Sequence, residues 1–95
     1  MLRKMYSVYD RKAEMFSQPQ FYVTDGEAVR AFVAVCGDND TMMGRFPADY
    51  ELFYVGDWAD HSGLVSAPPK GARSLCTAVE ARHRALHGVT DEEAQ

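Results

Sequence analysis

The sequence predicts an α+β fold in which an antiparallel sheet of about four strands packs against one helix, in the order β-β-α-β-β-α. Three observations support this class: aromatic and β-branched runs that suit strands, one segment with a helical apolar period, and turn residues between them. Since 95 residues are enough for one hydrophobic core and too few for two, we expect a single domain over residues 1–88. Residues 89–95 are expected to form a flexible tail.

The N-terminal part of the chain predicts two paired strands. Met5–Asp10 is rich in aromatic and branched residues, and Gln20–Thr24 has the same composition. Arg11–Pro19 has no clean period and ends at a proline, so we interpret it as a wide connection or a bulged edge. The two strands should therefore form an antiparallel hairpin.

A helix follows directly. Thr24 and Glu27 fit a capping box, in which the threonine hydroxyl accepts from the backbone and the glutamate reaches back. Gly37 is expected to give the helix a left-handed exit. One apolar stripe should pack on the sheet: Ala28, Val29, Phe32, Val33 and Cys36.

The middle of the chain holds the strongest strand signal. Asp38–Ala48 is predicted to be a polar loop, part of which docks through its apolar side chains. Asp49–Trp58 alternates Tyr50, Leu52, Tyr54 and Trp58 with Glu51, Phe53, Val55 and Asp57, which predicts a central strand. After a turn at 60–63, Leu64–Ser66 should complete a hairpin.

The C-terminal third predicts a second helix. Ser74 is expected to cap it after the Pro-Pro-Lys-Gly linker, and Gly88 is expected to stop it. Its apolar stripe is thin and comprises Leu75, Ala78, Val79 and Leu86.

Composition limits the function. Hydrophobic residues make up 46% and charged residues 25%, as in ordinary globular proteins, and no membrane anchor or secretory signal is expected. The net charge is −4, and residues 31–65 hold one basic and six acidic groups, so non-specific coating of DNA is disfavoured. Cys36 and Cys76 are too isolated for a metal pair or a disulfide framework, and we expect them to be buried.

No enzyme centre is predicted. A metal-dependent nuclease is a third hypothesis, which rests on seven residues with metal-binding side chains: Asp38, Asp40, Asp49, Glu51, Asp57, Asp60 and His61. Their spacing favours a solvated acidic face, because Met42 and Met43 interrupt a calcium loop. His83 and His87 have a zinc-binding spacing but no third ligand. We therefore expect no catalytic residue, metal or cofactor.

A candidate nucleic-acid surface surrounds the first strand. Basic residues there are interleaved with Tyr6, Tyr9 and Phe16, a mixture that can neutralise phosphates and stack on bases. The candidate residues are Arg3, Lys4, Tyr6, Tyr9, Arg11, Lys12 and Arg30. The alternative is that the aromatic rings fill the core and that the basic residues protect an edge strand from aggregation. All 11 aromatic residues lie within the first 58 positions, so a homodimer or higher oligomer is a second expectation, against burial in one core.

Several segments between residues 5 and 65 resemble one phage family. They are Tyr6–Ala13 (Tyr-Ser-Val-Tyr-Asp-Arg-Lys-Ala), Pro19, Ala28–Phe32, Phe46–Trp58 (Phe-Pro-Ala-Asp-Tyr-Glu-Leu-Phe-Tyr-Val-Gly-Asp-Trp) and Gly63. Together they resemble the small nonstructural protein of gokushoviruses, which are single-stranded DNA phages of the Microviridae. The resemblance implies a protein absent from the mature virion that serves DNA replication and packaging in the host bacterial cytoplasm.

Two functional hypotheses remain open. The first is a non-enzymatic accessory protein acting at the switch to single-stranded DNA synthesis and encapsidation, with single-stranded DNA or the phage replication complex as partner. The alternative is a dimeric protein-protein adaptor or assembly factor that does not bind DNA directly, which the acidic balance favours. No membrane partner is expected in either case.

Overall fold

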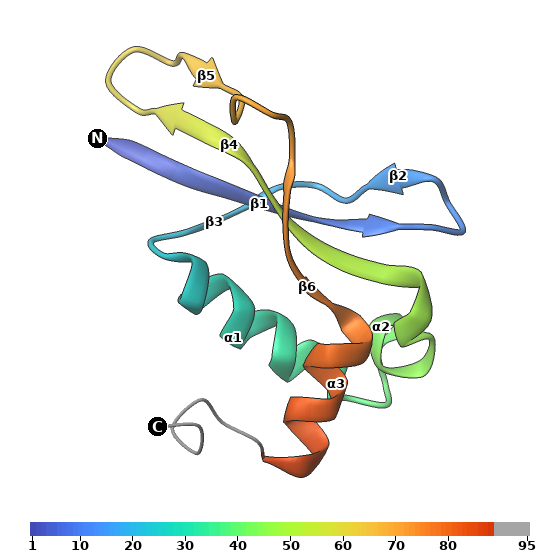
Figure 1. The fold of residues 1–95 in the computed structure, drawn as a ribbon. Helices are drawn as coiled ribbons and strands as arrows, with labels where there is room; N and C mark the ends of the chain where they lie inside the picture. The colour runs from blue at the N-terminus through green and yellow to red at the C-terminus, as the bar shows by residue number, and fades with distance from the viewer. Residues whose placement is uncertain (89–95) are drawn as a thin grey trace.

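Two long antiparallel strands form the centre of the sheet in the computed structural model, which describes residues 1–88. β1 (Leu2–Asp10) and β4 (Tyr50–Ala59) pair along their whole length. Each carries two short strands on its outer edge, so the sheet is about four strands wide. The short strands are β2 (Met15–Phe16) and β3 (Gln20–Tyr22) beside β1, and β5 (Val65–Ser66) and β6 (Arg73–Thr77) beside β4 (Figure 1). The predicted α+β class and antiparallel sheet are confirmed.

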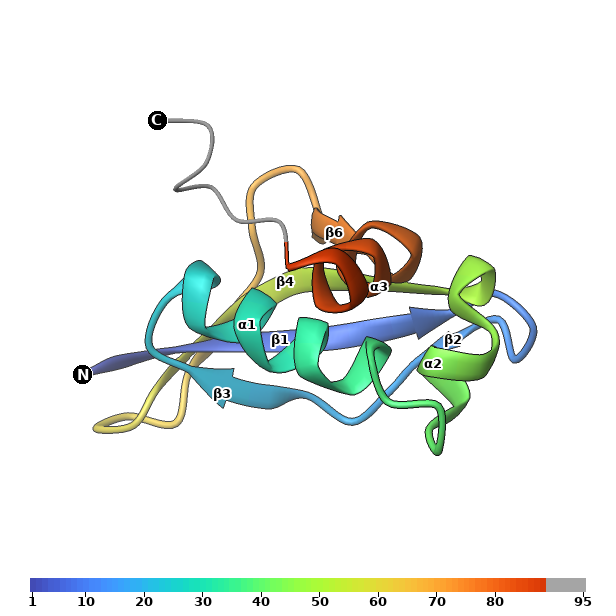
Figure 2. The same cartoon turned by 90° about the horizontal axis from the view of Figure 1, so that it is seen from below.

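The helices of the described chain lie on one face of this sheet. The elements are α1 (Asp25–Cys36), α2 (Met42–Arg45), the 3-10 turn η1 (Pro47–Asp49) and α3 (Ala78–His87). Figures 1 and 2, seen from two directions, place α1 and α3 side by side on the same side of the strands. The opposite face therefore has no helix over it in residues 1–88. Among these residues, no helix is long and apolar enough to cross a membrane.

The first helix begins where the sequence predicts. The Thr24 hydroxyl accepts a hydrogen bond from the backbone N–H of Glu27 at 3.1 Å, as predicted. The Glu27 carboxylate accepts from the backbone N–H of Val23 at 3.0 Å and not from that of Thr24, so only the threonine half of the predicted capping box forms. Its end differs from the prediction, because Gly37 has φ −82° and is not left-handed. Gly37 is needed for another reason: a Cβ there would lie 2.6 Å from the Cβ of Ala85 on α3. A glycine at this position lets the two helices approach closely.

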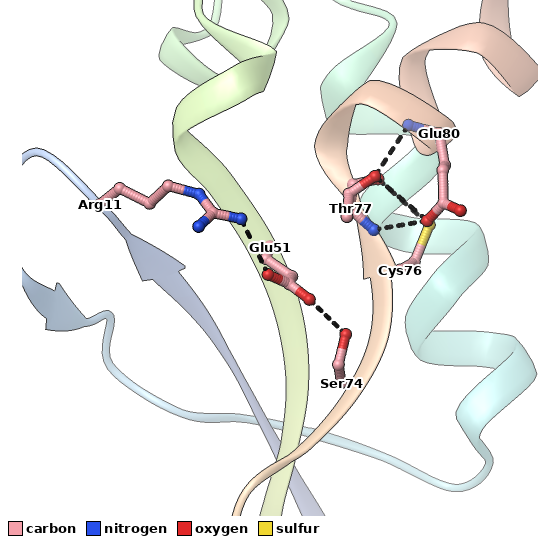
Figure 3. Close-up of polar contacts among 6 residues, drawn as sticks. All are labelled: Arg11, Glu51, Ser74, Cys76, Thr77 and Glu80. Carbon is pink, nitrogen blue, oxygen red and sulfur yellow. Dashed lines mark hydrogen bonds and ion pairs between the residues drawn. The ribbon is translucent and has the colours of Figure 1, made fainter.

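The C-terminal helix begins later than predicted. Ser74 does not cap it, because residues 73–77 form strand β6 on the edge of β4. The cap is Thr77, whose hydroxyl accepts from the Glu80 backbone while the Glu80 carboxylate accepts from Thr77, a capping box visible in Figure 3. Only a cap at Thr77 places a glutamate at the third helical position, which is the physical reason for the later start. Gly88 ends the helix in the left-handed conformation, as predicted.

The packing face of α3 also differs from its predicted stripe. Its buried residues are Ala78 and Ala81, whereas Val79 is 54% and Leu86 56% exposed. Small side chains suit the close contact between α3 and α1, and the larger ones lie outside it. The prediction of a stripe that included Val79 and Leu86 was wrong.

The core lies between the sheet and the helices. Phe32 from α1 and Leu52 from β4 are each 4% exposed and belong to one buried cluster, which confirms that the apolar stripe of α1 packs on the sheet. Cys36 and Cys76 are both free and buried, as expected, and burial raises the pKa of the Cys36 thiol to about 12. The buried cluster comprises Tyr6, Ala28, Phe32, Cys36, Leu52, Cys76, Ala78 and Ala81.

The predicted loop after α1 is partly helical. Thr41 caps the short helix α2 by accepting from the Gly44 backbone at 3.0 Å. Met43 packs against the core, so part of this segment docks as expected, while Met42 and Phe46 are about half exposed. The predicted tail at 89–95 lies outside the described residues.

A polar contact fastens the start of α1 to the sheet. The Tyr6 hydroxyl donates to Asp25 Oδ1 at 2.6 Å, and Arg73 on β6 donates to Asp25 Oδ2 at 3.1 Å. The Tyr6 hydrogen bond, and then that of Arg73, lower the pKa of the Asp25 carboxyl. Because two strands donate to one carboxylate at the first helical residue, this contact fixes α1 relative to both halves of the sheet.

Adding a methyl group at Gly37 should separate the two helices. Gly37→Ala is expected to lower the free energy of unfolding by about 1–3 kcal/mol, the usual cost of overpacking, as measured by urea denaturation. Ala85→Gly removes the opposing Cβ, so the double variant should lose less than the sum of the two single variants. Strictly additive losses would contradict the close approach.

Asp25 should make stability depend on acid pH. Its pKa is lowered by folding, so its contribution is fully present above the unfolded value of about 3.9 and is lost as pH falls through the folded pKa. Asp25→Asn removes this titration. Between about pH 4 and 2, urea unfolding should therefore show a smaller loss of stability in the variant than in the parent; equal losses would remove the proposed role of the carboxylate.

Candidate nucleic-acid interface

The strand alternation of β1 separates two sets of side chains. Tyr6 is 1% exposed and belongs to the core under α1. Since successive side chains of a strand point to opposite faces, Met5 and Tyr9 project from the face without helices. Arg3 and Ser7 alternate in the same way, and cross-strand neighbours share a face, so the residues opposite these four extend this surface. We name this surface the open face, and its large apolar and aromatic residues are Met5, Tyr9, Phe16, Phe21, Phe53 and Trp58.

Five aromatic rings form two groups on the open face. In one group, the ring centroids of Tyr9 and Phe16 are 4.9 Å apart, and those of Phe16 and Phe53 are 5.4 Å apart. In the other group, Phe21 and Trp58 are 5.5 Å apart. Phe16 is 41% and Phe21 47% exposed. Large apolar rings with this exposure on a sheet face are available for contact with a partner.

A bulge in β4 brings both groups to the same face. The β1–β4 register shifts between Met5 and Tyr6, because Met5 lies opposite Gly56 while Tyr6 lies opposite Tyr54. The extra residue, Val55, reverses the alternation, so Trp58 faces the same side as Phe53. This corrects the predicted pattern, which placed these two residues on opposite faces. Gly56 is the sequence signal for this bulge, since a glycine inside a strand often marks one.

Gly56 has a conformation that suits the bulge. Its φ is +152°, and a Cβ at this position would lie 2.5 Å from the carbonyl oxygen of Ser66 on β5. A side chain at this position would thus clash with the backbone of β5, and residues other than glycine rarely adopt this φ. The position of Trp58 on the open face therefore depends on a glycine two residues before it.

Basic residues lie at both ends of the open face. At one end Arg3, opposite Trp58, donates from Nε to Asp60 Oδ2 at 3.1 Å. At the other end Arg11 donates from Nη2 to Glu51 Oε1 at 3.1 Å, and Ser74 donates to the second oxygen of the same carboxylate (Figure 3). Hydrogen bonds from the N-terminus and from Arg3 lower the pKa of Asp60. The end of the face at Arg11 also carries exposed Lys12 in the β1–β2 turn.

The structure divides the residues predicted from the sequence. Arg3, Tyr9 and Arg11 lie on or beside the open face, and Lys12 follows Arg11 in the β1–β2 turn. Tyr6 does not belong to the interface, because its ring is buried and its hydroxyl donates a hydrogen bond to Asp25.

Two of the predicted basic residues lie elsewhere. Lys4 alternates with Arg3 and points to the helix side, where its charge helps to lower the pKa of Asp25. Arg30 belongs to α1, which covers the opposite face of the sheet. Phe16, which the sequence reasoning grouped with the basic residues, lies on the open face. The same reasoning missed three other aromatic residues of this face: Phe21, Phe53 and Trp58. Their separation from the core depends on strand pairing and on the bulge.

The acidic residues do not assemble as a metal centre. Within residues 1–88, no group of three or more His, Cys, Asp or Glu side chains could hold a metal ion. Two of the acidic residues that could have bound a metal, Glu51 and Asp60, form ion pairs with arginines. The ring centroids of His83 and His87 on α3 are 4.4 Å apart, and the ring planes are tilted by 41°.

Comparison with known proteins identifies the family. The family model described as phage ORF5 protein matches residues 3–81. No match was found among the curated proteins or among the solved structures. The matched segment runs from β1 into α3 and so includes the whole open face. With most of its length matched by this model, the chain belongs to the phage ORF5 protein family.

Proposed function

We propose that this phage protein binds single-stranded DNA on its open face and acts without catalysing a reaction. The observation that carries the proposal is the five-ring aromatic surface with Arg3 at one end and Arg11 and Lys12 at the other. Single-strand binders combine aromatic rings, on which bases stack, with cations that follow the phosphates. The open face offers both the aromatic rings and the cations.

The phage context supports a role in genome handling. The resemblance to the small nonstructural protein of gokushoviruses favours action at the switch from duplex replication to single-strand synthesis and packaging. It also favours a place in the host bacterial cytoplasm, outside the mature virion. At this stage single strands are exposed, and a protein that binds them reversibly through stacking and phosphate contacts suits the task.

A second candidate function is dimerisation through the same face, as in an adaptor or assembly factor. The exposure of Phe16, Phe21 and the neighbouring Val65, which is 67% exposed opposite Trp58, favours it. The two functions respond oppositely to salt. Phosphate contacts weaken as salt rises because counterion release contributes less, whereas apolar association between copies is strengthened by salts such as sulfate.

Removing the exposed rings should weaken DNA binding. Phe16→Ala and Phe21→Ala are each expected to reduce affinity for a labelled oligothymidylate by about 5- to 140-fold, since one stacked base contributes about 1–3 kcal/mol. Fluorescence anisotropy at low salt measures this.

Phe46→Ala is the matched control for this experiment. Phe46 is 50% exposed and follows α2 on the helix side of the sheet. Its loss should leave affinity unchanged. Equal effects at Phe46 and at the two open-face rings would contradict DNA binding on the open face. A monomer–dimer equilibrium altered by Phe16→Ala, without any DNA binding by the parent, would favour the adaptor function.

A further inference from the structure

We propose that Glu51 and Asp60 compete with the DNA phosphates for the arginines at the two ends of the open face. The inference rests on the proposed function and extends it to how binding is limited and reversed. Each carboxylate already occupies, in the free protein, an arginine that a bound strand would use. Binding therefore exchanges one anion for another.

The Glu51 site is the more firmly built of the two. The Glu51 side chain is 18% exposed, and its two oxygens accept from Arg11 and from Ser74 on the neighbouring strand. In Figure 3 these donors approach the carboxylate from opposite sides. Glu51 lies opposite Tyr9 in the sheet, so its charge sits beside the first aromatic group. A phosphate at Arg11 would meet this carboxylate at close range.

The Asp60 site repeats the arrangement at the other end. Asp60 accepts from Arg3 at 3.1 Å and from the N-terminal amine at 3.0 Å. Arg3 is the cross-strand neighbour of Trp58, which belongs to the second aromatic group. Each aromatic group thus has one arginine beside it, and each of these arginines has one carboxylate.

Exchange of these partners is energetically accessible. The side chains of Arg3 and Arg11 are 50% and 53% exposed, and exposed ion pairs contribute only about 0–1 kcal/mol. Guanidinium groups bind carboxylate and phosphate with the same donor geometry. After exchange, the displaced carboxylate stays close and repels the phosphate, which lowers affinity and speeds release. The aromatic rings then supply most of the attraction.

Neutralising Glu51 should therefore strengthen DNA binding. Glu51→Gln keeps the size of the side chain and one of the two acceptor oxygens that Arg11 and Ser74 now use, and it removes the charge. We expect oligothymidylate to bind about two- to fivefold more tightly, with a logarithmic salt slope steeper by about 0.7 if one further phosphate contact forms. Asp60→Asn should act in the same direction, and it serves as the second variant if Glu51→Gln destabilises the fold.

Two controls separate local competition from net charge. Asp40→Asn removes the same charge in the turn between α1 and α2 on the helix side, and it should change affinity less. In an Arg11→Ala background, the gain from Glu51→Gln should disappear, because the freed donor is absent. Equal affinities for the Glu51, Asp60 and Asp40 variants would overturn the inference alone. No DNA binding by the parent or by any variant would remove the proposed function with it.

Discussion

The pairing of β1 with β4 is the interaction on which the rest of the structure depends. These strands pair over their whole length, and every other strand is attached to one of them. The bulge at Val55 in this pairing decides which side chains of β4 share a face. It is accommodated by Gly56, whose φ of +152° few other residues adopt. The face on which the last residues of β4, Trp58 among them, lie therefore depends on one glycine.

The two faces have different chemistry as a consequence. On the helix side, Tyr6 is buried and its hydroxyl is bonded to Asp25, which orients α1. On the open face, rings remain partly exposed, and the arginines beside them are held by carboxylates. A protein with net charge −4 can still bind a phosphate chain if its cations are concentrated beside stacking surfaces, because the interaction of exposed charges is screened beyond about 8–10 Å.

Local sequence patterns predicted where the helices and strands lie better than which side chains share a face. The capping residues of α1, the strand at residues 49–58 and the burial of both cysteines could be read from composition and spacing. The start of α3 was missed because Ser74 and Thr77 are both suitable caps, and only Glu80 distinguishes them. Phe53 and Trp58 were missed because their common face depends on long-range pairing: they share it only through the bulge. Tyr6 was assigned to the site although its alternation with Tyr9 places it in the core.

Trp58 offers the most direct test of the open face, because it is the single tryptophan of the chain and contacts Phe21 within this surface. Its emission should be followed while single-stranded oligothymidylate is added at low salt, with anisotropy of the labelled strand recorded in parallel. Our account predicts saturable quenching of Trp58 that parallels the anisotropy and is reversed by salt. Binding by anisotropy with unchanged Trp58 emission would place the DNA elsewhere and contradict it.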